Sequence, residues 1–148
     1  MRAMMDMARS NGEEWVGHCH DDGMLSREDL QKLIDFIQDP PDDAYLVQSY
    51  NPHEPTYCGQ IYIILNTKKY WEAGGHDTDF TLYWADIDFL LRQEAIGNKE
   101  YSLTTETLYH AGSATLHRNT ELHKAKHVHY FNADKAYFQL KHPTYQIK

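Results

Sequence analysis

Short strand-like segments alternate along this chain with amphipathic helical segments, and turn-forming residues separate them. Four apolar runs rich in β-branched or aromatic residues predict strands at residues 15–20, 45–48, 61–65 and 104–109. Apolar residues at helical spacing predict helices at residues 3–10, 26–38, 82–95 and 121–140, with a turn or short helix at 68–72. This alternation indicates an α/β fold, in which ligands collect beyond the carboxyl ends of the strands.

Two of these helices have specific sequence signals. Ser26, with Asp29 three residues later, forms a capping-box pattern before the helix at 26–38. In the helix at 82–95, Asp88 and Arg92 can pair at i, i+4 on the polar side. The apolar side of that helix is predicted to consist of Ile87, Leu90, Leu91 and Ala95.

Length, charge and cysteine content limit the class of protein. The chain has 148 residues, which fits one domain, and a formal charge of −8. The negative charge argues against binding to nucleic acid or to an anionic membrane surface, and no apolar run has membrane-spanning length. Cys19 and Cys58 are expected to be buried thiols of a reducing compartment, which indicates a cytoplasmic protein.

A first polar cluster follows the strand at residues 15–20. His18, His20 and Asp22 share one face of an extended segment, because side chains in a strand repeat with a period of two. Nitrogen and oxygen ligands of this kind can converge on one divalent ion, and carboxylates favour Mg²⁺ or Mn²⁺. The alternative is that Asp21 and Asp22 only form the turn that ends the strand.

A second cluster holds Asp86 and Asp88 at the start of a predicted helix. Carboxylates at this position are stabilised by the helix dipole without any further role, and Asp88 is interpreted as such a solvated helix start. Asp86 follows a Tyr-Trp pair and is a candidate general base in a partly apolar wall.

His110, His123 and His127 are further candidate functional residues. His110 ends a strand and precedes small residues whose backbone N–H groups can face an anion, or it is a hydrogen-bonded surface histidine. His123 and His127 have the i, i+4 spacing of helical zinc sites, but Lys124 stands where such sites have a glutamate.

In order along the chain, three blocks resemble the glycosyltransferase family 2 pattern of the GT-A fold. Residues 14–25 look like the strand that leads into its aspartate-rich D-x-D turn. Residues 74–92 are similar to its G-G-F-D-E-x-F and W-E-D-x-D-x-x-x-R block, and residues 109–115 resemble its Y-H-x-G-S-x-T segment. The likeness covers about residues 1–140.

This resemblance implies an α/β, GT-A-like (Rossmann-like) mixed sheet flanked by helices, with residues 1–148 as one partial domain. It implies a metal-dependent transferase, of the hexosyl or deoxyhexosyl type, that moves a sugar from a nucleotide-diphosphate donor to a glycan or other hydroxyl acceptor with inversion. The implied ligands of Mn²⁺ or Mg²⁺ are His20, Asp22 and His110, and the implied catalytic base is Asp86. The implied substrate-binding residues are Asp21, Gly75, Asp77, Trp84, Ser113, Thr115 and Arg118.

The chain departs from the family pattern in three respects. His20 stands at the first D-x-D position, and Ala85 replaces the glutamate before Asp86. Nothing resembles the opening strand, helix and second strand that bind the nucleotide, so the domain is expected to be incomplete at its N-terminal side. A longer enzyme, a complementing chain or homo-oligomer, and a remnant all remain open, as does a non-catalytic carbohydrate-binding or assembly subunit of the same fold.

Overall fold

The main sheet combines parallel and antiparallel neighbours. The computed structural model describes residues 1–20, 23–52, 62–81, 83–105, 109–110 and 121–146. Its four-stranded sheet has the order β1-β4-β3-β5. The strands are β1 (Trp15–Cys19), β3 (Ala44–Tyr50), β4 (Tyr62–Asn66) and β5 (Lys99–Thr104). Strand β4 is antiparallel to both neighbours and β3 is parallel to β5, so β1, β3 and β5 all run in the same direction. The side of the sheet where these three strands end is called its carboxyl edge below.

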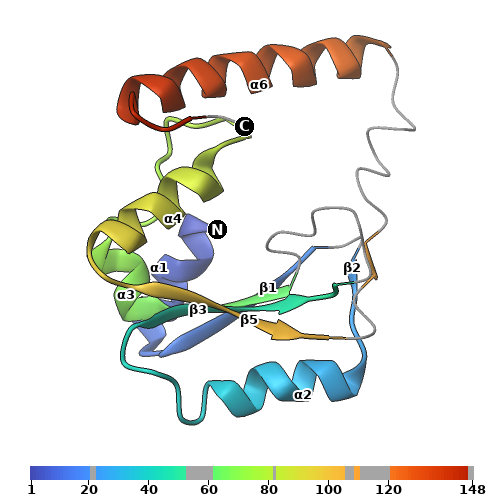
Figure 1. The fold of residues 1–148 in the computed structure, drawn as a ribbon, viewed down its shortest axis with the longest axis vertical. Helices are drawn as coiled ribbons and strands as arrows, with labels where there is room; N and C mark the ends of the chain where they lie inside the picture. Colours follow the sequence, from blue (N-terminus) through green and yellow to red (C-terminus); the bar gives the residue numbers. More distant parts are fainter. Residues whose placement is uncertain (21–22, 53–61, 82, 106–108, 111–120, 147–148) are drawn as a thin grey trace.

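A second, two-stranded sheet lies beyond that carboxyl edge. Strand β2 (Gly23–Met24) comes shortly after β1, and β6 (Tyr109–His110) comes shortly after β5. The two strands pair antiparallel, with Gly23 opposite His110 (Figure 1).

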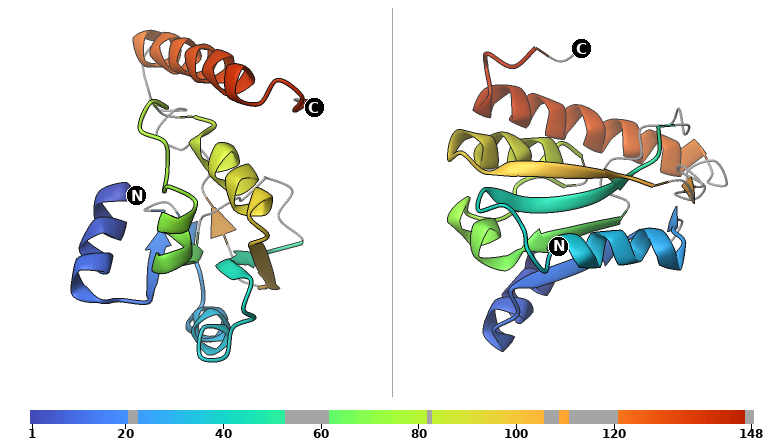
Figure 2. Two further views of the ribbon diagram at one scale, coloured as in Figure 1. Left: turned by 90° about the vertical axis from the view of Figure 1, so that its left-hand side faces the viewer. Right: turned by 60° about the horizontal axis from the view of Figure 1, so that its bottom comes forward.

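Helices cover both faces of the main sheet. Helix α2 (Arg27–Phe36) covers one face, and α1 (Arg2–Asn11), α3 (Thr67–Glu72) and α4 (Ala85–Ala95) cover the other (Figure 1). Helix α6 (Glu121–Lys141) lies outside α4 as a further layer (Figure 2). No described helix combines the length and the apolar character needed to cross a bilayer.

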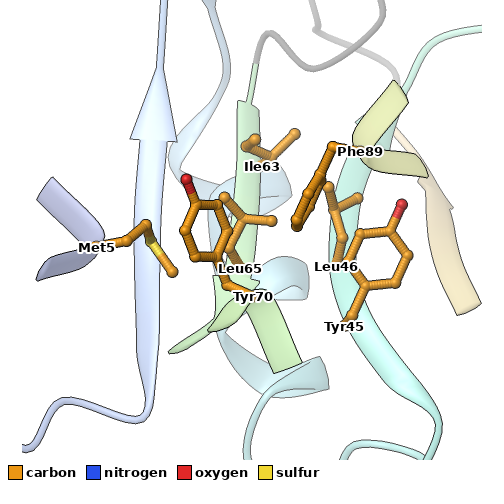
Figure 3. Close-up of a cluster of buried hydrophobic side chains, with 7 residues drawn as sticks. All are labelled: Met5, Tyr45, Leu46, Ile63, Leu65, Tyr70 and Phe89. Carbon is orange, nitrogen blue, oxygen red and sulfur yellow. The ribbon is translucent and has the colours of Figure 1, made fainter. Parts of the chain in front are cut away.

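The larger part of the core lies between the sheet and the α1, α3 and α4 layer. Seven buried side chains form this cluster (Figure 3): Met5, Tyr45, Leu46, Ile63, Leu65, Tyr70 and Phe89. A smaller cluster of Leu33, Val47 and Ile64 lies on the α2 side. Successive residues such as Ile63 and Ile64 therefore contribute to opposite faces, as the pleat of a strand requires.

The α/β alternation and most of the predicted elements are confirmed. The capping interaction at α2 is present, because the Asp29 N–H donates to the Ser26 Oγ at 3.0 Å. The strand predicted at residues 104–109 is misplaced: β5 covers Lys99–Thr104 and β6 begins at Tyr109, while residues 106–108 of the prediction lie outside the described residues. Only one face of this edge strand is apolar, with Tyr101 and Leu103 packed toward α2, and this sparse pattern hid it in the sequence.

The buried face of α4 also differs from the prediction. Asp88, Phe89 and Gln93 are buried, whereas Ala95 is exposed. Gln93 can be buried because its amide donates to the Lys69 carbonyl at 3.0 Å and its Oε1 accepts from Asn98 at 2.7 Å. Hydrogen bonding thus overrides the apolar pattern on which the prediction depended.

The prediction of buried thiols is wrong for Cys19, which is exposed and free. Cys19 lies on β1, which is the first strand in the sheet order and therefore an edge strand. Cys58 lies outside the described residues.

Candidate active site

The carboxyl edge of the main sheet brings two of the predicted site segments together. Gly23, the residue after Asp22, is the register partner of His110, so their Cα atoms lie roughly 4.5–5.5 Å apart. His18 and His20 lie on one face of the β1 segment, with ring centroids 5.6 Å apart, as the period of two predicts. Chain segments that are far apart in the sequence therefore meet at this edge.

Helix α4 directs its amino end toward the same edge. The helix leads through residues 96–98 into the amino end of β5, so the two elements run in opposite directions (Figure 1). Asp86 is half-buried in the first turn of α4, where the helix dipole favours a carboxylate.

Trp84 precedes α4 in a strained backbone conformation. Its φ of 66° lies in the left-handed region, which costs a residue other than glycine about 1–3 kcal/mol. Packing against α6 compensates for this strain, because the Trp84 ring centroid lies 5.6 Å from that of Phe131 and 5.1 Å from that of Phe138. The buried indole Nε1 has no hydrogen-bond partner among the described residues. Substrate binding by Trp84 stays a prediction.

The Gly74-Gly75 turn packs closely against Tyr70. Gly75 has a φ of 69°, and a Cβ there would lie 2.8 Å from the Tyr70 ring, so only glycine fits. The Tyr70 hydroxyl accepts from the His76 N–H at 3.0 Å, and the His76 ring stacks on Phe89 at 4.6 Å. Burial, with the positive amino terminus and Arg92, lowers the pKa of His76 to about 4, so its imidazole is neutral at pH 7.

Asp88 is the centre of a buried ionic network. Its carboxylate is fully buried and contacts the Arg92 guanidinium at 2.9 Å, Lys141 at 2.8 Å and His142 at 2.8 Å. Burial would raise the pKa of Asp88, but hydrogen bonds from Lys141, His142 and Arg92 outweigh it and lower the pKa. The prediction of a solvated helix start is therefore wrong, while the predicted Asp88–Arg92 pair is confirmed.

Arg92 extends this network to the glycine turn. Its guanidinium also donates to the Ala73 carbonyl and, at 2.7 Å, to the Gly75 carbonyl. The buried carboxylate of Asp88 consequently links the glycine turn, α4 and the end of α6.

Asp77 and Asp134 make further contacts between α6 and the loops before α4. The Asp77 Oδ2 accepts from Lys141 at 2.6 Å and from the Tyr137 hydroxyl at 3.1 Å. Burial alone would raise the pKa of Asp77, yet hydrogen bonds from Lys141, the Asp79 N–H and Tyr137 lower it to about 2. Asp134 is buried and accepts from the N–H groups of residues 81 and 83, at 3.0 and 2.8 Å.

Sequence reasoning missed these α6 residues. Phe131, Asp134, Phe138 and Lys141 follow one another at helical spacing, so each polar residue belongs to an aromatic stripe. A polar side chain inside an apolar stripe is the signal that could have identified them.

The zinc hypothesis for His123 and His127 stays a prediction. Both residues lie on α6, the His127 Nδ1 makes a 2.7 Å hydrogen bond with the Tyr83 hydroxyl, and the side chain of His123 lies outside the described part of the structure. Throughout the ranges that the structure describes, no three His, Cys, Asp or Glu side chains are placed to hold a metal ion.

Part of the predicted site lies outside the described residues. This part comprises Asp21, Asp22, Ser113, Thr115 and Arg118. Only the backbone position of His110 is described. Neither a family model, nor a curated protein, nor a solved structure matches this chain.

Replacement of Asp88 by Asn should lower the free energy of unfolding by about 1.5–3 kcal/mol, because the partly exposed Arg92 and Lys141 would lose the hydrogen bonds of their buried carboxylate partner. Asp86→Asn, in the same turn of α4, is the matched control and should change stability little. Urea unfolding of both variants measures the difference. Equal effects would contradict the central position of Asp88.

The contribution of Asp77 to stability should depend on pH. Its pKa of about 2 in the folded protein lies below the unfolded value of about 3.9, so its stabilisation is complete above about pH 5 and is lost as the pH falls toward 2. The stability difference between wild type and Asp77→Asn should therefore shrink between pH 5 and pH 2, as measured by urea unfolding. The exposed Asp39→Asn is the control, and a difference that stays constant would contradict the Lys141 pairing.

Proposed function

We propose that this chain is a metal-dependent glycosyltransferase with a GT-A-like fold. It moves a sugar from a nucleotide-diphosphate donor to a hydroxyl acceptor, with inversion at the anomeric carbon. The observation that carries the proposal is the pairing of Gly23 with His110, which brings two blocks of the family pattern to one edge of the sheet.

The candidate metal ligands at this edge suit the proposed ion. An imidazole from His20 or His110 and the carboxylate of Asp22 combine nitrogen and oxygen ligands, a combination that Mn²⁺ accepts and that Mg²⁺ accepts less readily. When bound, such an ion neutralises the diphosphate and makes it a better leaving group. Asp21, Ser113, Thr115 and Arg118 are proposed to contact the donor.

Asp86 is proposed to take the proton from the acceptor hydroxyl as that oxygen attacks the sugar. Its position in the first turn of α4 supports this role, because that helix is fixed by the Asp88 network. Gly75 and Asp77 are proposed to shape the acceptor side through the turn that Arg92 holds. Trp84 is proposed to contact the sugar.

The open edge of β1 supports the proposal of a complementing part. Strand β1 is first in the sheet order, and no described strand pairs with its outer edge. A nucleotide-binding segment, from a complementing chain or from another part of the protein, is proposed to add there.

Asp86→Asn should reduce turnover by about 10²–10⁴-fold while leaving donor binding nearly unchanged, because only the proton acceptor is lost. The assay measures nucleoside diphosphate released from UDP-, GDP- and dTDP-sugars with Mn²⁺ and hydroxyl acceptors. Asp6→Asn, on the exposed side of α1, is the control. A fully active Asp86→Asn protein would refute its role. Glycan binding without metal or turnover would favour the non-catalytic subunit.

A further inference from the structure

A cavity of about 290 Å³ lies between the start of α1, the glycine turn, α4 and the end of α6. Three basic side chains from three different helices line it: Arg2, Arg92 and Lys141. The other lining residues are Gly74, Gly75, Asp77 and Thr78. Figure 1 shows the start of α1 and α4 on the side of the molecule away from β2. The cavity is therefore separate from the segments proposed to bind the metal ion.

Arg2 carries a positive charge that no described carboxylate balances. Its Nη1 donates to the carbonyls of Gly74 and His76, at 3.2 and 2.9 Å, and both of these acceptors are neutral. Asp6 follows one helical turn later, but its carboxylate pairs with Arg9 at 3.2 Å. The Nε and Nη2 groups of Arg2 make no hydrogen bond to a described residue. Arg2 thus has both charge and donors available for an anion.

The Trp71 ring keeps the Arg2 guanidinium in place. The Arg2 Cζ lies 5.0 Å from the ring centroid, which is a cation–π distance, and the Arg2 side chain is half-buried. Arg9 stacks on the same ring at 4.4 Å, but it lines a different cavity. Because Arg2 is held before any ligand arrives, binding costs less side-chain entropy.

Arg92 places a second guanidinium beside Arg2. It donates to the carbonyls of Ala73 and Gly75, on either side of the Gly74 carbonyl that Arg2 binds. The Arg92 side chain is 26% exposed, so part of it remains accessible. A Cβ at position 74 would lie 3.7 Å from the Arg92 Nη1, so glycine there leaves this side of the guanidinium uncovered.

The charged groups around the cavity leave one positive charge unbalanced. Asp88 pairs with Arg92 and Lys141, and Asp77 pairs with Lys141. The three cations that line the cavity therefore share two carboxylates within the described ranges. Both Asp77 oxygens are already in use, since Oδ2 accepts from Lys141 at 2.6 Å and Oδ1 accepts from the Asp79 N–H at 2.9 Å. The excess positive charge favours an anionic occupant.

We propose that this cavity binds a phosphate group. Arg2 makes the main contact, because a guanidinium presents parallel N–H donors that match phosphate oxygens. Arg92 and Lys141 add positive charge, and the hydroxyl of the exposed Thr78 is a further donor. The site does not depend on the proposed transferase activity.

The test is titration of the ¹⁵N-labelled full chain with sodium phosphate and, separately, with methyl phosphate, in metal-free buffer at constant ionic strength. The amide resonances of Gly74, Gly75 and Thr78 should shift and saturate, whereas that of Gly12, at the other end of α1, should not. The probe with the lower Kd identifies whether the source is free phosphate or a phosphate ester. Because neither metal nor sugar is present, failure of this site is distinguishable from failure of the transferase proposal.

Arg2→Gln should weaken phosphate binding by about tenfold or more, because charge-assisted hydrogen bonds are lost. Arg9→Gln is the matched control: it removes the same charge from the same helix and the same Trp71 ring, and it should bind as wild type does. Arg2→Lys keeps the charge without the planar fork and should bind severalfold more weakly than wild type, which keeps the test valid if Arg2→Gln fails to fold. Absence of saturable shifts in wild type, or equal affinities of the Arg2→Gln and Arg9→Gln proteins, would overturn the proposal.

Acetate at the same ionic strength separates phosphate from other oxyanions. It should bind more weakly, because its single charge and two oxygens allow fewer charge-assisted hydrogen bonds. Acetate binding as tight as that of phosphate would overturn the assignment of the cavity to a phosphate group.

Discussion

The buried carboxylate of Asp88 is the interaction on which the arrangement of this protein depends most. A carboxylate without solvent exposure is costly unless charged partners compensate it. Arg92 of α4 and Lys141 at the end of α6 supply these charges, and His142, just after α6, makes a further hydrogen bond to it. Because Arg92 also donates to the Gly75 carbonyl, this one carboxylate links α4, the end of α6 and the glycine turn, and Asp77 adds a further contact to Lys141. Ion pairs on the surface, such as Arg9 with Asp6, cannot have such an effect.

This network explains how a helix outside the main layers influences the candidate site. Helix α6 does not belong to the layer that covers the sheet, yet its Asp134 holds residues 81 and 83 just before α4. Trp84 then adopts its strained conformation between those contacts and the first turn of α4. The first turn of α4, which carries Asp86, is thus positioned by α6 as well as by the sheet.

Local sequence signals predicted where most helices and strands lie. Contacts between residues far apart in the sequence determine which side chains are buried. Capping by Ser26 and the pairing of Asp88 with Arg92 depend on neighbouring residues, so they are visible in the sequence. The burial of Asp88 depends on residues more than 50 positions away, and the exposure of Cys19 depends on the order of the strands. Neither effect has a local pattern that a reader of the sequence could use.

The candidate site shows the same division. Side chains in a strand alternate between two faces, and this alternation predicted that His18 and His20 lie on the same face. The pairing of Gly23 with His110 agrees with the expectation that polar clusters gather beyond the strand ends. The contacts that fix Gly75 and Asp77 came instead from α6, whose polar residues had no assigned role in the sequence.

The central claim is that positions 20, 22 and 110 surround one cation. Titration with Mn²⁺, observed through the imidazole proton resonances of the full chain, tests it directly. The paramagnetic ion should broaden the resonances of His20 and His110 at substoichiometric amounts, leave that of His129 sharp, and lose this effect in Asp22→Ala. Sharp resonances for both His20 and His110, or equal broadening in the variant, would contradict the claim.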